Sequence, residues 1–149
     1  DEPLVLEPVE VNLGLDWAAH TTETLGEALI NFTISDWRKS PDVVQIANHW
    51  GGDLLQVWDA EDGSFLALWQ LAWDSSSDAV AFYGHLIDIM PRPVLRGLVR
   101  DTTPAAGLPR GRWWAGGQGA VFLYRQGKNI VLVWGSDAAA VESAALALN

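Results

Sequence analysis

Four short segments of this chain are largely apolar, and a short polar turn joins the segments in pairs. Residues 54–59 and 64–74 flank the turn Asp59-Ala60-Glu61-Asp62-Gly63, whose Asp-Gly step is typical of a β-hairpin. Residues 120–126 and 130–134 flank a second polar turn in the same way. The pattern therefore predicts two β-hairpins, one in each half of the chain.

The segment before the first hairpin predicts two helices. Thr24-Leu25-Gly26-Glu27 fits a capping box, in which the threonine hydroxyl and the glutamate carboxylate bind free amides at a helix start. We expect this helix to continue to about Arg38 and to bury Leu25, Ala28, Leu29 and Phe32. A short second helix is expected from Ser40 to Gly51-Gly52, because glycine permits the left-handed turn that often ends a helix.

Each hairpin is followed by a further predicted helix. The helix after the first hairpin is capped by the Asp74-Ser75 region and ends at Pro91, and its apolar positions recur at three and four residues. Ser136 is expected to cap the last helix, which follows the second hairpin. The order strand, strand, helix thus occurs twice. It predicts an α+β fold with a sheet of about four mainly antiparallel strands (ββα–ββα) and helices mainly on one face.

Proline and glycine are frequent in the two segments whose apolar residues follow no clear helical or strand period. Residues 1–20 are expected to form an extended N-terminal arm or connector that packs on another part of the protein, because the segment contains Pro3 and Pro8 beside an alternation at Val9, Val11 and Leu13. Residues 21–149 are expected to form a single α+β domain. Within it, residues 91–118 are rich in Arg, Pro, Gly and Trp, and they predict a short helical piece near 94–100 followed by a long loop.

Composition narrows the range of partners. The 149 residues suffice for one domain, and 49% apolar content supports a hydrophobic core. A net charge of -10 argues against nucleic acid and against anionic membranes as partners. No apolar run reaches the roughly 20 residues that a membrane-spanning helix needs, so no membrane insertion is expected. The absence of cysteine excludes disulfides and thiolate chemistry.

No metal, cofactor or catalytic motif is apparent. His20, His49 and His85 match no ligand spacing, and the acidic turn at 59–63 is too short for a calcium loop. The serines at 75–77 lack the pattern of an activated nucleophile, and no carboxylate pair is singled out by its spacing. We therefore expect no cofactor, no metal and no catalytic residue in this chain.

Tryptophan and arginine supply the candidate binding residues. Core packing accounts for several of the nine tryptophans, but Trp58, Trp113 and Trp114 are better candidates for the surface. Arg110 and Arg112 precede the last two, and a guanidinium can stack on an indole ring. These five residues are the predicted binding site. Simple anchoring of the loop, and solvation of its arginines, are the alternatives.

Short motifs along the chain resemble a pattern in some exported bacterial proteins. Thr24-Leu25-Gly26-Glu27 is followed by Trp50-Gly51-Gly52-Asp53, and the next hydrophobic strand ends in Trp73-Asp74-Ser75. Asp78-Ala79-Val80-Ala81-Phe82 then begins a helix, and a hairpin from Gly119 onward precedes a terminal helix rich in alanine and leucine. In these motifs the chain is similar to the C-terminal companion region of proteins whose N-terminal half is a zinc-metallopeptidase-like domain bearing an H-E-x-x-H helix.

The resemblance implies a context but transfers no catalytic residue, because the chain contains no H-E-x-x-H motif. It implies a non-catalytic accessory or interaction domain of a secreted or envelope-associated protein, with the peptidase-like domain of the same parent as partner. An extracellular or cell-envelope location follows from the resemblance. The chain itself carries no signal peptide, and we interpret its abrupt start at Asp1 as a processed or trimmed end.

Two other functions remain open from the residues. The chain is either such an accessory domain or a free-standing module that binds a glycan, a peptide or a small ligand through exposed tryptophan and arginine. A weaker alternative is a hydrolase whose site has no recognisable motif.

Overall fold

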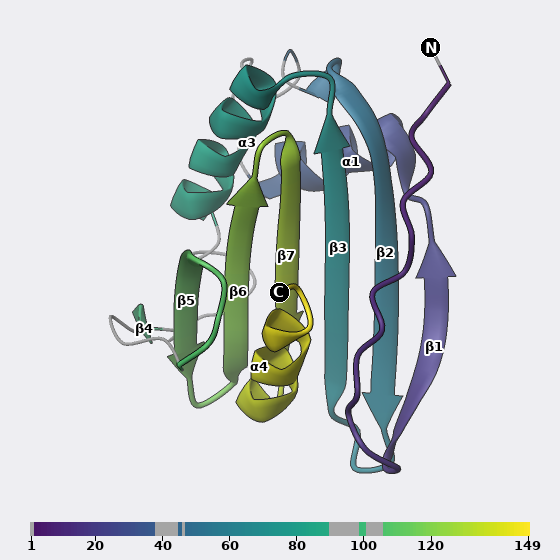
Figure 1. The fold of residues 1–149 in the computed structure, drawn as a ribbon, viewed down its shortest axis with the longest axis vertical. Coiled ribbons are helices and arrows are strands. Elements are labelled where there is room, and N and C mark those ends of the chain that lie inside the picture. Colours follow the sequence, from purple (N-terminus) through teal and green to yellow (C-terminus); the bar gives the residue numbers. More distant parts are fainter. Residues whose placement is uncertain (1, 38–44, 46, 90–98, 101–105) are drawn as a thin grey trace.

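The computed structural model describes residues 2–37, 45, 47–89, 99–100 and 106–149. Within these residues one antiparallel sheet forms the centre of the molecule, with strand order β1-β2-β3-β7-β6-β5-β4 (Figure 1). Its strands are β1 Trp17–Glu23, β2 Trp50–Ala60, β3 Phe65–Trp73, β4 Val99–Arg100, β5 Gly111–Gly116, β6 Gly119–Gln126 and β7 Asn129–Gly135. The helices are α1 Gly26–Trp37, α3 Ser76–Ile89 and α4 Ala138–Leu146.

The α+β class and both predicted hairpins are confirmed. β2 and β3 pair through the acidic turn, and β6 and β7 pair through the turn at Gly127. β3 and β7 are neighbours, so the two hairpins join through their second strands. The backbone amide of Ser64 donates to the carboxylate of Asp62 at 2.8 Å, which identifies the acidic segment as a closed hairpin turn.

The sheet is wider than the four strands predicted. β1 adds to the free edge of β2, and β5 with β4 adds to the free edge of β6. β5 lies inside residues 91–118, where the sequence predicted a loop. Trp113 and Trp114 explain the difference, because adjacent indoles point to opposite faces of a strand and each is buried against a different core cluster. The predicted helical piece near 94–100 lies largely outside the described residues, and its last two residues form β4.

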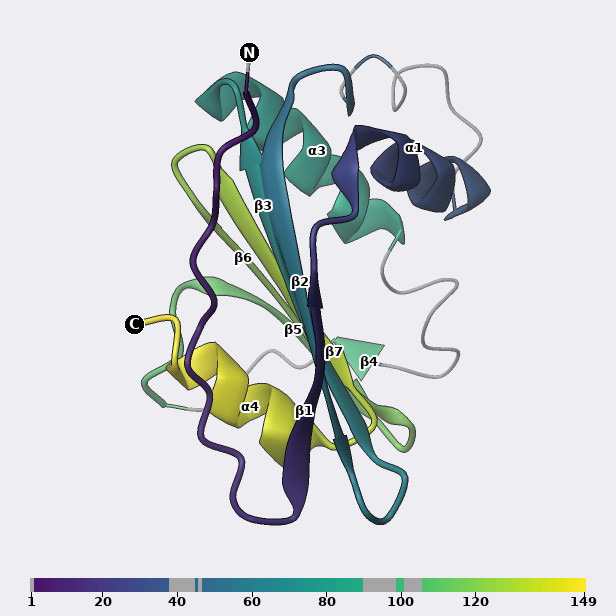
Figure 2. The ribbon, with the colours of Figure 1, turned by 90° about the vertical axis from the view of Figure 1, so that its right-hand side faces the viewer.

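The helices cover both faces of the sheet. α1 and α3 pack against one face, hereafter the α3 face, around Trp69, Trp73 and Phe82. α4 packs against the other, the α4 face, around Phe122 and its neighbours. Figure 2 shows α1 and α4 on opposite sides of the sheet. Of the three helices described, α1 and α3 thus share one face, in keeping with the prediction of helices mainly on one face, and α4 is the exception.

A difference of one residue sends α3 and α4 to opposite faces. Trp73 and Trp134 both pack against the core of the α3 face. The hydroxyl of Ser75, two residues after Trp73, accepts the amide of Asp78 and begins α3. The N-cap of α4 is Asp137, three residues after Trp134. Because successive strand residues point to opposite faces, the additional residue reverses the side on which the helix leaves.

Two expected helix caps are wrong. Ser136 does not cap α4: its hydroxyl accepts the amide of Phe65 at 3.0 Å, and Asp137 accepts the amide of Ala139 instead. The capping box at Thr24 is also wrong, because the Thr24 hydroxyl donates to the backbone carbonyl of Asp53 at 3.2 Å. Tertiary contacts with β3 and β2 thus replace the local bonds that the sequence pattern predicted.

Asp53 in β2 is the residue that begins α1. Its carboxylate accepts the amides of Leu25 and Gly26, each at 2.9 Å, and the indole N–H of Trp69 at 3.0 Å. Anchored in this way, α1 directs Ile30 into the core and leaves Leu29 and Phe32 48% and 72% exposed. The predicted buried face of this helix was therefore wrong at Ala28, Leu29 and Phe32, all of which are exposed.

Gly51 and Gly52 lie inside β2 and do not end a helix. The strand register shifts between Trp50 and Gly52, which marks a β-bulge. The N-terminal segment passes directly over this point, and the amide of Leu4 donates to the carbonyl of Gly51 at 2.7 Å. A Cβ on Gly52 would lie 2.5 Å from the carbonyl oxygen of Leu4, so only glycine permits this approach. Most of the predicted helix before Gly51 lies outside the described residues.

Candidate functional site

Residues 2–16, hereafter the arm, cross the α4 face without regular secondary structure (Figures 1 and 2). Val9, Val11 and Leu13 pack against the α4-face core. Two glutamines of the sheet also bind the backbone of the arm. Gln56, 5% exposed, accepts the amide of Val9 at 2.9 Å and donates to its carbonyl at 3.1 Å. Gln70 donates to the carbonyl of Glu7 at 2.8 Å.

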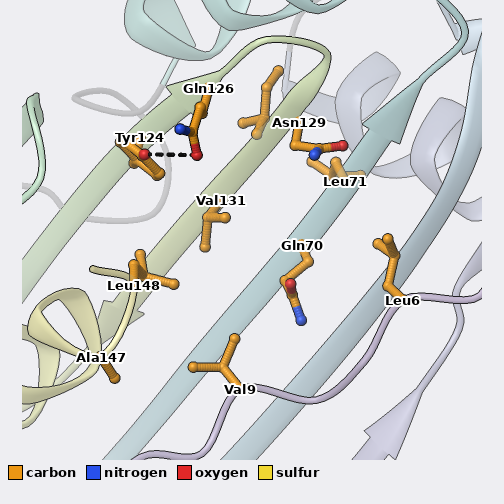
Figure 3. A pocket seen from close by; sticks show the side chains of 11 residues that line it. Leu6, Val9, Gln70, Leu71, Tyr124, Gln126, Asn129, Val131, Ala147 and Leu148 are labelled. Carbon is orange, nitrogen blue, oxygen red and sulfur yellow. Dashed lines mark hydrogen bonds between the residues drawn. The ribbon is translucent and has the colours of Figure 1, made fainter.

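α4 and the arm leave part of this face open, and a cleft of about 270 Å³ lies between them. Figure 3 shows Leu6 and Val9 of the arm on one side and Ala147 and Leu148 on the other, with Gln70 and Val131 on the strands between. The rest of the lining comes from β3, β6 and β7: Leu71, Tyr124, Gln126, Asn129 and Ile130.

The cleft has apolar walls and uncharged polar groups. Among the described residues that line it there is no Asp, Glu, Lys, Arg or His, although the chain carries a net charge of -10. The Tyr124 hydroxyl donates to Gln126 Oε1 at 3.2 Å, whereas the Asn129 side chain makes no hydrogen bond to any described residue. Apolar surface with a few convergent polar groups is the usual lining of a small-molecule site. The arrangement suits a small uncharged ligand that carries amide or hydroxyl groups.

A second pocket on the α3 face has the opposite character. Arg110, Arg112 and Arg125 line an open pocket of about 500 Å³ together with Gly111 and Tyr83 of α3. Burial raises the pKa of Tyr83 above its usual 10.0, while the charges of Arg112 and Arg125 act to lower it. Among the described residues, no carboxylate lies within 4 Å of these guanidiniums. This cluster is hereafter the arginine pocket.

The structure separates the predicted site residues. Trp58, Trp113 and Trp114 are 9%, 8% and 4% exposed, so the prediction of surface indoles is wrong. Trp113 packs near Phe122 on the α4 face, with ring centroids 6.4 Å apart, and Trp114 belongs to the core of the α3 face. The core clusters on the two faces of the sheet bury these indoles. Arg110 and Arg112 do meet in one pocket, although without the tryptophans.

Several residues of both pockets were absent from the predicted site. Arg125 and Tyr83 reach the arginine pocket through strand pairing and helix packing, which local sequence does not reveal. The cleft residues were also missed. Gln70 offered one signal, because it is the single polar side chain within the otherwise apolar strand β3.

Potential metal ligands and long apolar helices are the remaining features of interest in the described residues. No three His, Asp or Glu side chains gather as a potential metal site within the part of the chain that the structure describes. None of the helices described is long and apolar enough to cross a membrane. His20 Nδ1 lies 3.9 Å from Asp59 Oδ2 at the exposed edge of the sheet.

Comparisons with known proteins place the chain in a family and identify a fold relative. Residues 14–145 match the family described as Domain of unknown function (DUF8575). No curated protein matches the chain. The fold is similar to the crystal structure of the extracellular domain of PknH from Mycobacterium tuberculosis, with a TM-score of 0.53 and 12% sequence identity. That match covers 89% of this chain and 84% of the other.

Proposed function

We propose that this chain, which belongs to the family described as Domain of unknown function (DUF8575), is a non-catalytic ligand-binding domain that acts outside the cytoplasm. The observation that carries the proposal is the uncharged cleft between the arm and α4. A cleft lined by no described Asp, Glu, His, Lys or Arg is suited to holding a neutral molecule, and the Tyr124 phenol is the one group among its described residues that general acid–base catalysis uses.

The size of the cleft sets the scale of the ligand. At about 270 Å³ it lies just below the range of roughly 300–1,000 Å³ typical of sites for drug-sized molecules. We therefore expect a ligand the size of one sugar ring or a capped dipeptide. At roughly 0.3 kcal/mol for each of about 15 non-hydrogen atoms, the binding free energy would be near -4.5 kcal/mol, which corresponds to a Kd somewhat below ~1 mM.

The fold relative supports an extracytoplasmic location, because its structure is described as that of an extracellular domain. The resemblance in sequence motifs points the same way. At 12% identity the relative shares only the fold, so the ligand proposed for this chain rests on its own cleft.

The accessory role implied by the metallopeptidase resemblance is the second candidate, and one contact favours it. Leu6 and Val9 line the cleft, and they belong to the arm that the resemblance connects to a peptidase-like half. Ligand binding would then alter the contacts of the arm and so the placement of its neighbour. Reading the gene upstream of Asp1 tests this role: an open frame that encodes no H-E-x-x-H helix would exclude it.

A thermal-shift and calorimetry panel tests the ligand proposal. The panel contains N-acetylglucosamine oligomers and N-acetyl dipeptide amides, which are uncharged and carry amide groups. Asn129→Trp places a large side chain at the exposed rim of the cleft, and Lys128→Trp, one residue away in the turn, is the matched control. We expect binding to the parent and the control, and at least tenfold weaker binding to Asn129→Trp. Equal affinity for all three proteins would refute the cleft as the site.

A further inference from the structure

We propose that the arginine pocket is a second binding site, for the phosphate group of a small soluble molecule. It lies on the α3 face at the β5–β6 side of the sheet, whereas the cleft lies on the α4 face. The inference therefore does not rest on the proposed function.

Strand register brings the three arginines together. Gly111 pairs with Tyr124 and Arg112 pairs with Leu123, so Arg110, one residue before, lies opposite Arg125. Residues at alternate positions share a face, so Arg110 and Arg112 project on the same side of β5. Tyr83 of α3 completes the pocket, and its hydroxyl is 3.4 Å from the carbonyl of Leu123.

The charges of this pocket are not balanced within the described part of the chain. Like charges directly opposite each other on paired strands destabilise a sheet. The protein has 19 acidic and nine basic residues, yet three of the basic ones converge here with no described carboxylate within 4 Å. Arg125 Nη1 donates to the carbonyl of Gly127 at 2.8 Å, and the Arg112 guanidinium interacts with the Tyr83 hydroxyl. Because each guanidinium carries five N–H donors, donors remain that no described residue uses and that a ligand can engage.

A phosphate group matches these donors better than a carboxylate does. Guanidinium groups bind phosphate oxygens through paired, charge-assisted hydrogen bonds, and a dianion can engage several of them at once. A single carboxylate offers only two oxygens. Nucleic acids and anionic membranes carry extended negative charge, which the net charge of -10 repels. These considerations favour a small soluble phosphate compound.

Isothermal titration calorimetry with inorganic phosphate and with pyrophosphate, at low ionic strength, tests the proposal. Arg112→Gln and Arg125→Gln remove one charge each from the pocket. Lys128→Gln makes the same change of net charge in an exposed turn outside it and is the control. Tyr83→Phe removes the phenol hydroxyl alone. Far-UV circular dichroism of each variant establishes that it is folded. If one arginine variant does not fold, the other alone suffices for the test.

We expect saturable binding, tighter for pyrophosphate, with Kd raised about tenfold or more by either arginine variant and unchanged by Lys128→Gln. Affinity should fall steeply between low and physiological salt. Three results would overturn the proposal: no saturable binding below about 10 mM, equal loss in the lysine control, or unchanged affinity in both arginine variants. Sedimentation with phosphatidylglycerol vesicles in the absence of any binding to the two soluble anions would also overturn it.

Discussion

Replacing Asp53 by alanine is expected to destabilise this fold more than any change at the protein surface. The side chain is 2% exposed and connects three elements, because its carboxylate accepts two amides at the start of α1 and the indole N–H of Trp69 in β3. Asp53→Ala removes all three acceptor contacts at once. It leaves the donors of Leu25, Gly26 and Trp69 without a partner.

The cost follows from the burial of those donors. An unsatisfied buried donor costs about 1–3 kcal/mol, and loss of an N-cap side chain costs about 1 kcal/mol. The amides at Leu25 and Gly26 are only partly buried, so water replaces part of their bonding. We expect a loss of about 3–5 kcal/mol from the free energy of unfolding, a large share of the roughly 5–15 kcal/mol typical of domains. Asp53→Asn keeps one acceptor oxygen and should cost about 2 kcal/mol.

Urea unfolding followed by tryptophan fluorescence and far-UV circular dichroism measures both losses. Asp59→Ala removes the same charge from an exposed position of the same strand and is the control, with an expected change within about 1 kcal/mol. If the free energy of unfolding of Asp53→Ala lies within about 1 kcal/mol of that of the parent, Asp53 is not the residue that holds α1 on the sheet.

Three further predictions concern the arm and the arginine pocket. In Gly52→Ala the new Cβ is forced against the carbonyl of Leu4, so limited proteolysis should cut the arm several-fold faster than in the parent. Gly84→Ala is the control: its Cβ meets open space on α3, and it should raise the free energy of unfolding by up to ~1 kcal/mol. Equal cleavage of the two variants would contradict the close approach of Leu4 to Gly52. Gln56→Leu removes both hydrogen bonds to Val9 and should speed amide hydrogen exchange at Val9, with little change in β6. An unaltered exchange rate at Val9 would show that Gln56 does not hold the arm. Because burial raises the folded-state pKa of Tyr83 above 10.0, its contribution to stability is complete below pH 10 and is lost as pH rises through the folded-state pKa. Tyr83→Phe should therefore lose less stability than the parent in urea unfolding above pH 10, and parallel losses would refute the burial of this phenol.

Local pattern predicted the strands of the two hairpins, from apolar segments joined by polar turns, and the helix with the clearest apolar period. Both hairpins formed as expected, and Ala79, Phe82 and Leu86 of α3 are buried. The same reasoning failed where a distant residue decides the local structure. Asp53 replaced the expected cap at Thr24, and the backbone of Leu4 explains glycines that otherwise resemble a helix end.

The candidate site also contains residues that the sequence identified and residues that only the structure reveals. Arg110 and Arg112 were identified as candidates because they are concentrated in one segment, and the structure places both in one pocket. Their partners Arg125 and Tyr83 come from other elements, so only the register of β5 with β6 and the packing of α3 reveal them. Trp113 and Trp114 were wrongly predicted to lie at the surface because β5 was expected to be a loop. A strand with covered faces buries two successive indoles, whereas a loop would have exposed them.

The location of bound ligand on the protein is the most direct test of the proposed binding function. In a ¹H–¹⁵N correlation spectrum titrated with N-acetylglucosamine oligomers and N-acetyl dipeptide amides, we predict saturable shifts at Gln70, Tyr124, Asn129 and Val131, with smaller shifts at Leu6 and Val9 of the arm. Asn129→Trp should abolish them. Shifts confined to other surfaces, or none with any member of the panel, would contradict a ligand site between the arm and α4.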